Sequence, residues 1–132
     1  MEENLSSKTT VCIMDDNEDI REIYGMKFER EGFAVIQAKD GEEGMRLVKE
    51  KKPDIILLDI QMPVLDGLGV LDALKADEEL AKIPVVILSN VDNDITFQEV
   101  IESGRAQYYL VKSLTDAQKV VDITLEVLAS RK

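Results

Sequence analysis

The sequence predicts an α/β fold in which helices cover both faces of a five-stranded parallel sheet. Short apolar runs alternate strictly along the chain with longer segments of helical periodicity, five of each. Three of the five runs are almost continuously apolar, as expected for central strands that are covered on both faces. The length of 132 residues suits one domain. Right-handed crossovers then give an open, doubly wound sheet.

The five strand candidates are short runs bounded by turn signals. They are residues 10–15 (TVCIMD), 34–38 (AVIQA), 55–59 (IILLD), 84–89 (PVVILS) and 108–112 (YYLVK). The first, third and fourth are the nearly continuous apolar runs, so we expect them in the middle of the sheet and the second at an edge.

The segments between the strands carry apolar residues at helical spacing. They are residues 18–31, 41–51, 66–76, 94–103 and 115–129. Gly32, Pro53 and Gly104 follow three of them as stop signals. Asn17 and Asp19 are the two candidates for the cap of the first helix.

Two strand orders suit this alternation: the flavodoxin-like order 2-1-3-4-5, and half of a Rossmann dinucleotide fold. The Rossmann alternative needs G-x-G-x-x-G after the first strand, where this chain has the acidic DDNED. An anionic pyrophosphate would be repelled there, and no phosphate-binding G-x-x-x-x-G-K-[ST] motif occurs anywhere. The sequence therefore predicts a flavodoxin-like (βα)5 domain of order 2-1-3-4-5.

The composition limits partners and location. A net charge of −11, from 16 basic and 27 acidic residues, argues against nucleic acid and favours a cationic partner or a bound cation. No apolar run is long enough to cross a bilayer, and the first residues do not resemble a secretory signal. We therefore expect a cytoplasmic protein without membrane contact. Cys12, the only cysteine, lies in an apolar run and is expected in the core.

Histidine is absent, which removes the commonest general base and the commonest transition-metal ligand. Any bound metal is then expected to be a hard cation with oxygen ligands, such as Mg²⁺. Any covalent chemistry falls to Asp, Ser, Lys or Tyr.

Polar residues end four of the five strands, at the edge where doubly wound sheets bind their ligands. Asp15 and Asp16 end the first strand, Asp59 the third, Ser89 the fourth and Lys112 the fifth. Crowded carboxylates repel one another, and a divalent cation between them removes that cost. A cation, an ammonium group and a hydroxyl around a carboxylate form a cradle for a phosphoryl group, and aspartate is an established phosphoryl acceptor.

Each of these residues also has a simpler explanation. An aspartate after a strand is typical of a turn or a helix cap, and a lysine at a strand end is commonly solvated. Five residues of suitable types at one edge of a sheet favour the functional interpretation over five separate coincidences.

These motifs together resemble the response-regulator receiver domains of two-component signalling, the CheY-like family. The carrying motifs are VCIMDD, LLDIQMPVLDG, PVVILS and YYLVK. The resemblance spans residues 9–130, with residues 1–8 expected to be a flexible segment. One departure is Ser113, where the family usually has proline after the lysine, so we expect a trans Lys112–Ser113 bond.

The resemblance implies a role for each matching residue. Asp59 is the phosphoacceptor and, with Asp16 and the backbone carbonyl of Gln61, a direct Mg²⁺ ligand, while Asp15 acts through water. Lys112 and Ser89 contact the phosphoryl oxygens.

Tyr109 stands at the aromatic switch position, three residues before the lysine, and would turn inward as Ser89 shifts. The alternative is an ordinary strand aromatic, since Tyr108 is adjacent and no local feature separates the two.

The family relation also implies partners. A histidine kinase or a histidine phosphotransfer protein would donate the phosphoryl group. Since this chain has no histidine, the donor must be another protein or a small acyl phosphate. We expect a phosphoacceptor switch and not an enzyme, although the domain assists its own phosphorylation and dephosphorylation. A downstream protein would read the surface of the fourth helix, fifth strand and fifth helix. The readout is expected to be protein–protein contact, unless this chain is an excised piece of a larger protein.

Two alternatives remain beside this hypothesis. One is an aspartate-nucleophile phosphatase of the haloacid-dehalogenase type, which needs a D-x-D motif on the first strand where this chain has adjacent aspartates. The other is a receiver-like scaffold that is never phosphorylated, against which the complete acidic set and Lys112 argue.

Overall fold

The computed structural model describes residues 8–60, 62, 66–89, 100, 106–111 and 116–130. Five parallel strands form one sheet in the order β2-β1-β3-β4-β5. The strands are β1 (Thr10–Met14), β2 (Ala34–Ala38), β3 (Ile55–Leu58), β4 (Val85–Ser89) and β5 (Tyr108–Val111). The predicted flavodoxin-like fold and strand order are confirmed.

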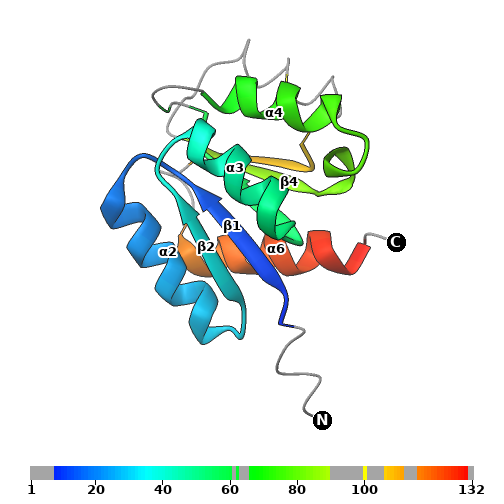
Figure 1. Cartoon of the computed structure of the whole chain (residues 1–132). Helices are drawn as coiled ribbons and strands as arrows, with labels where there is room; N and C mark the ends of the chain where they lie inside the picture. Colours follow the sequence, from blue (N-terminus) through cyan, green and yellow to red (C-terminus); the bar gives the residue numbers. More distant parts are fainter. Residues whose placement is uncertain are drawn as a thin grey trace.

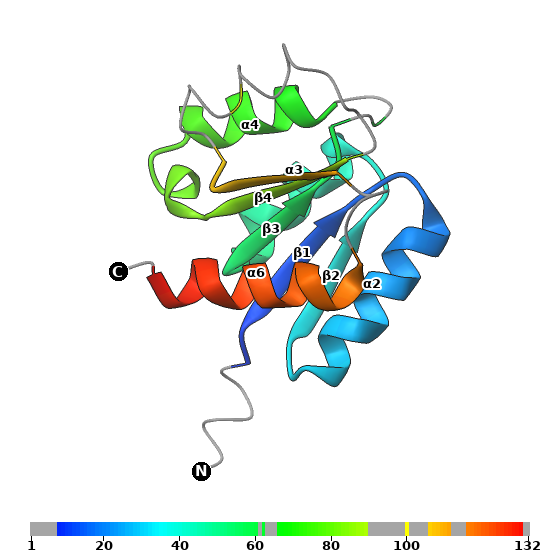
Figure 2. The ribbon, with the colours of Figure 1, turned by 180° about the vertical axis from the view of Figure 1, so that it is seen from behind.

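Helices cover both faces of the sheet. The described helices are α2 (Glu18–Arg30), α3 (Gly41–Lys51), α4 (Gly67–Ala76), a short 3-10 helix η1 (Leu80–Lys82) and α6 (Ala117–Ser130). Figure 1 shows α3 in front of the strands, and Figure 2, seen from behind, shows α6 crossing in front of them. Their ends agree with the predicted ones to within two residues, and η1 was not predicted. The predicted helix 94–103 lies, except for Val100, outside the described residues.

The core consists of two apolar layers, one on each side of the sheet. Alternate strand residues point to opposite faces. One layer joins β-strand residues such as Met14 and Leu58 to α3 and α4, and the other joins residues such as Ile13 and Leu57 to α2 and α6. Cys12 is fully buried in the first layer, as predicted, and burial, with a further effect of the Glu43 charge, raises the pKa of its thiol to about 12.

Short polar side chains cap the helices that start at the carboxyl ends of strands. Asn17 Oδ1 accepts from the N–H of Ile20 at 3.1 Å, so Asn17 rather than Asp19 caps α2. Asp40 caps α3 in the same way. Because each cap fixes where its helix begins, it also fixes the turn that leaves the strand.

Among the residues that the structure describes, no helix combines the length and the apolar character needed to span a membrane.

Candidate functional site

Three aspartates meet at the carboxyl edge of the sheet. One carboxylate oxygen from each of Asp15, Asp16 and Asp59 lies within 4.8 Å of the other two. The strand register brings them together, because Met14 pairs with Leu58 and both strands leave the sheet side by side. The N–H of Asp59 donates to the carbonyl of Met14 at 2.9 Å, which extends the ladder by one residue. The structure thus brings together three of the predicted site residues.

Two of the three carboxylates are buried. Asp15 is 3% exposed and Asp59 5%, whereas Asp16 is exposed. Asp15 is held by its own bonds: its N–H donates to the carbonyl of Ala38 at 3.1 Å, and its Oδ1 accepts from the N–H of Asn17 at 2.9 Å. Negative charges this close destabilise one another unless a positive charge lies near them.

The residues fit a magnesium ion. Mg²⁺ prefers oxygen ligands in octahedral geometry, where opposite oxygens are about 4.2 Å apart. Adjacent ligand oxygens are closer, about 2.9 Å apart. The limit of 4.8 Å leaves room for a cation that some of the three carboxylates hold directly and others through water. Asp59 and Asp15, at the ends of two central strands, would form the fixed part of such a site, and the exposed Asp16 the part that faces solvent.

A neutral phenol side chain lines a small cavity at the cluster. Tyr24 of α2 lines the same small cavity as Asp15 and Asp59. Burial, and then the negative charges of Asp15 and Asp116, raise the pKa of Tyr24 above its usual value of 10.0. Tyr24 therefore remains protonated at neutral pH and adds no charge to the cluster.

The chain after Asp59 packs tightly against the start of α4. The N–H of Gly67 donates to the carbonyl of Ile60 at 2.8 Å. A Cβ atom on Gly67 would lie 2.6 Å from the carbonyl oxygen of Asp59 and 2.6 Å from the Cα of Ile60, so only glycine fits. Asp66 caps α4 by accepting from the N–H of Gly69 at 2.9 Å. Asp66 and Gly67 thus hold the backbone next to Asp59.

Sequence reasoning missed one residue at this edge. Nη1 of Arg21, on α2, donates to the backbone carbonyl of Asp15 at 2.7 Å. One signal was present in the sequence: a cation near the amino end of a helix is unfavourable with the helix dipole, so an arginine there suggests a specific contact.

The other predicted residues are only partly described. Ser89 is the last residue of β4 and pairs with Val111 at the end of β5. The structure describes the backbone of Ser89 but not its side chain. Lys112, which follows Val111, and Gln61 lie outside the described residues, as does the Lys112–Ser113 bond. Tyr109 on β5 is half-buried and packs against the layer that includes α3 and α4.

A larger cavity, of about 560 Å³, lies away from the cluster, where α4 and η1 meet the start of β4. Leu74, Ile83 and Val85 line its apolar part. The Gln107 side chain in its wall accepts a hydrogen bond from the N–H of Val85 at 2.7 Å. Among the described residues that line this cavity, Glu78 is the only one with a carboxylate.

A doubly wound parallel sheet with three aspartates at its carboxyl edge is typical of α/β proteins that place their functional site at this edge. The profile of the response regulator receiver domain matches residues 11–124, and the chain belongs to this family. The family's general function is that of a phosphoacceptor in two-component signalling, and neither the phosphatase alternative nor the scaffold alternative is favoured.

Individual relatives agree. The transcriptional regulatory protein PrrA of Mycobacterium tuberculosis is 38% identical over 116 residues, which are 86% of this chain and 47% of PrrA. The polar-differentiation response regulator DivK of Brucella anthropi is 34% identical over 108 residues, 80% of this chain and 85% of DivK. The receiver domain of a Francisella response regulator superposes with a TM-score of 0.82 at 31% identity, covering 94% of this chain and 98% of that domain. This chain spans about half the length of several curated relatives.

Proposed function

We propose that Asp59 is the phosphoacceptor of this receiver domain, and that Asp15, Asp16 and Asp59 hold the Mg²⁺ ion needed for phosphorylation. The observation that carries the proposal is the convergence of the three carboxylates within 4.8 Å at the end of the central strands. Asp59 is the best placed acceptor because it ends β3, which lies between β1 and β4 in the middle of the sheet.

The chemical step is an in-line displacement. A carboxylate oxygen of Asp59 attacks the phosphorus of a phosphohistidine on the donor protein. The new acyl O–P bond forms as the N–P bond breaks, and the imidazole nitrogen leaves with its electron pair and takes a proton from solvent. When bound, Mg²⁺ offsets the negative charge of the carboxylates and of the phosphoryl oxygens.

The remaining predicted residues complete this proposal. The carbonyl of Gln61 is a further metal ligand, and Asp15 acts mainly through a bound water. Lys112 and Ser89 contact the phosphoryl oxygens. Their support is the family motif and, for Ser89, its place at the end of β4 next to β3.

Phosphorylation then acts as a switch. A phosphoryl group on Asp59 draws Ser89 toward it, Tyr109 moves inward, and the surface around β5 and α6 changes. The donor is a histidine kinase or a histidine phosphotransfer protein, and a downstream protein reads the altered surface. We place this exchange in the cytoplasm, which suits the single buried thiol of Cys12.

The test is phosphorylation by a small acyl phosphate in the presence of Mg²⁺, followed by intact mass measurement. We expect one phosphoryl adduct in the wild type, none in Asp59→Asn and none after a chelator removes Mg²⁺. Asp122→Asn, an exposed change on α6 with the same chemistry, is the matched control and labels as the wild type does. Equal labelling of Asp59→Asn and the wild type would refute the assignment.

A second assay separates this proposal from the phosphatase alternative. Turnover of a phosphomonoester that is lost in Asp15→Ala and retained in Asp59→Ala would favour the phosphatase. We expect no such turnover in the wild type.

A further inference from the structure

A partly buried hydrogen bond links α2 to the backbone of the acidic cluster. Nη1 of Arg21 donates to the carbonyl oxygen of Asp15 at 2.7 Å, in a partly buried position. This distance is at the short end for an N–H···O bond, and the donor is charged, so the bond is among the stronger kinds in proteins.

The acceptor is the carbonyl of the peptide that joins two candidate metal ligands, Asp15 and Asp16. A peptide unit is planar, so an anchored oxygen also restrains the amide and the Cα of the residue that follows. Asp15 has further anchors on β2 and at the α2 cap, through Ala38 and Asn17. Asp16 is exposed and is joined to Asp15 by this peptide.

The guanidinium of Arg21 contacts the backbone and not a carboxylate. Within the described part of the chain, Arg21 forms no salt bridge, and its guanidinium contacts a main-chain oxygen instead of neutralising a carboxylate. Arg21 thus acts on the backbone between Asp15 and Asp16 and not on either carboxylate. Hydrogen bonds of this kind, made to the ligands and not to the metal, commonly orient the ligands of a metal site.

We propose that Arg21 is a positioning residue for the metal site, and that its hydrogen bond to the carbonyl of Asp15 sets the direction in which Asp16 approaches Mg²⁺. This inference rests on the proposed function, because it assumes that the three aspartates hold the ion.

A purely electrostatic role of Arg21 predicts a change in Mg²⁺ affinity of the opposite sign. A cationic guanidinium close to the cluster repels a divalent cation, so removal of its charge alone strengthens Mg²⁺ binding. Loss of a positioning bond weakens Mg²⁺ binding, because Asp16 must then be ordered when the ion binds. The direction of the change in affinity therefore separates the two roles.

The experiment measures Mg²⁺ affinity by titration calorimetry of the full chain, together with the Mg²⁺ dependence of labelling by a small acyl phosphate. Arg21→Met keeps the aliphatic stem and removes the donor. Arg30→Met removes the same charge from the exposed far end of α2 and is the matched control. Arg21→Lys keeps the charge but is one bond shorter, and thermal unfolding monitors the fold of every variant.

We expect Arg21→Met to weaken Mg²⁺ binding by about tenfold and to raise the half-saturating Mg²⁺ concentration equally, with little change in the labelling rate at saturating Mg²⁺. Arg21→Lys also binds Mg²⁺ more weakly than the wild type. If Arg21→Met does not fold, the Mg²⁺ affinity of Arg21→Lys decides the test. Arg30→Met binds as the wild type does.

Unchanged or tighter Mg²⁺ binding in both Arg21 variants would overturn this inference and leave the proposed function standing. Absence of both Mg²⁺ binding and labelling in the wild type would overturn the two together.

Discussion

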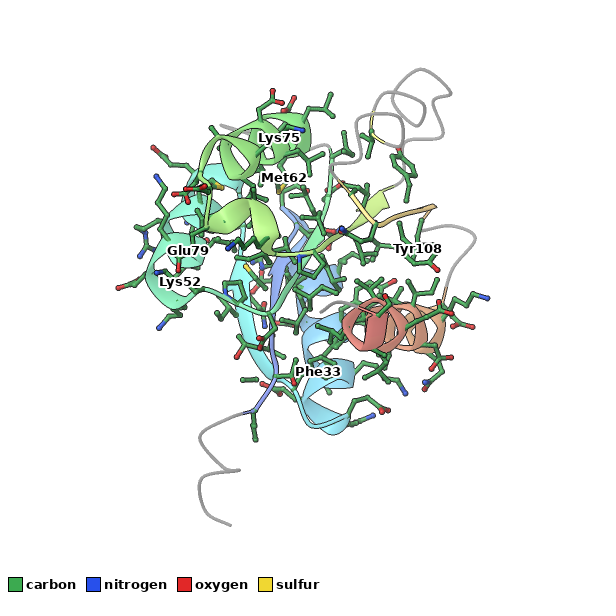
Figure 3. All side chains as sticks on the ribbon, turned by 90° about the vertical axis from the view of Figure 1, so that its right-hand side faces the viewer. Phe33, Lys52, Met62, Lys75, Glu79 and Tyr108 are labelled. Atoms are coloured by element: carbon green, nitrogen blue, oxygen red, sulfur yellow. The ribbon has the colours of Figure 1, made fainter. Side chains whose placement is uncertain are left out.

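Tyr108 and Tyr109 are neighbours on β5 but lie on opposite faces of the sheet. The hydroxyl of Tyr108 donates to Glu126 Oε1 at 3.1 Å, which ties β5 to α6 at the surface. Figure 3 shows Tyr108 beside α6. Tyr109 is half-buried and packs against the apolar layer of α3 and α4. The two aromatic rings therefore sit in different environments, and each gives its own prediction.

The first prediction concerns Tyr109 as the switch aromatic. We expect Tyr109→Ala to be phosphorylated normally but to lose the structural response in β5 and α6, because its half-buried ring is the one that packs against the layer that includes α3 and α4. Amide spectra recorded by NMR before and after acyl-phosphate treatment measure this response. In Tyr109→Ala the shifts stay near Asp59, whereas in the control Tyr108→Ala they spread as in the wild type. Equal spreading in both variants would contradict the assignment.

The second prediction concerns the ionisation of Tyr108. The hydrogen bond to Glu126, and then the negative charge of Glu126, raise the pKa of Tyr108 above its usual value of 10.0. Since the neutral phenol is the favoured form in the folded state, this contact contributes stability below the unfolded-state pKa. The contribution is lost as pH rises through the higher folded-state pKa.

Ultraviolet absorbance of the phenolate, recorded against pH, checks this prediction. We expect Glu126→Gln to lower the pKa of Tyr108, with the difference between each protein and its Tyr108→Phe counterpart isolating this one residue. A pKa of Tyr108 that does not change in Glu126→Gln would show that the hydrogen bond does not form in solution.

The third prediction concerns Gly67, at the start of α4. Gly67→Ala places a Cβ atom 2.6 Å from the backbone of both Asp59 and Ile60, and backbone atoms cannot move aside as a flexible side chain can. We expect a loss of about 1–3 kcal/mol of stability from this overpacking, and slower labelling because the Asp59 backbone shifts.

Gly25→Ala is the matched control for Gly67→Ala. Its Cβ would meet the Nε2 atom of Gln37 at 3.0 Å, and Gln37 is exposed and free to turn away. Alanine also favours a helix interior by about 1 kcal/mol relative to glycine. Gly25→Ala therefore keeps both stability and labelling. Chemical unfolding and the initial rate of adduct formation are the measurements, and equal behaviour of the two variants would contradict the prediction.

The sequence predicted the strand order and the meeting of Asp15 with Asp59, because both follow from general rules. Continuous apolar runs mark central parallel strands, and parallel strands end at one edge. The contact of Arg21 was not predictable in the same way. It depends on the turn at which α2 begins and on the direction of one long side chain, which periodicity does not encode.

The two tyrosines show the same limit. Period-two alternation assigns a strand residue to a face only where apolar and polar residues alternate, and two adjacent aromatics leave the phase undefined. The register that pairs Ile87 with Tyr109 settles it in the structure. Gly67 is similar. It is the last residue of the motif LLDIQMPVLDG, but its close approach to the Asp59 carbonyl is visible only in the structure.

The last prediction concerns two exposed apolar side chains on α2. Ile23 is 56% exposed and Met26 54%, and they are neighbours at positions i and i+3 of one helix face. α2 begins at Glu18, and its cap, Asn17, directly follows Asp15 and Asp16. Under the proposed function, a donor protein that brings a phosphohistidine to Asp59 covers surface next to the cluster. Apolar side chains there supply binding energy that a small acyl phosphate does not use.

If the proposed function holds, we expect the double variant Ile23→Ser, Met26→Ser to receive phosphoryl groups from a protein donor at least about tenfold more slowly. Full burial of such a side chain is worth roughly 1.5–3 kcal/mol. Labelling by a small acyl phosphate does not change, because the chemical groups are intact. Leu125→Ser, at a 47% exposed apolar position on α6, is the control and keeps the wild-type transfer rate. An equal slowing with both donors would mean that the change disturbs the acidic cluster itself, and an equal loss in Leu125→Ser would exclude α2 as the specific docking surface.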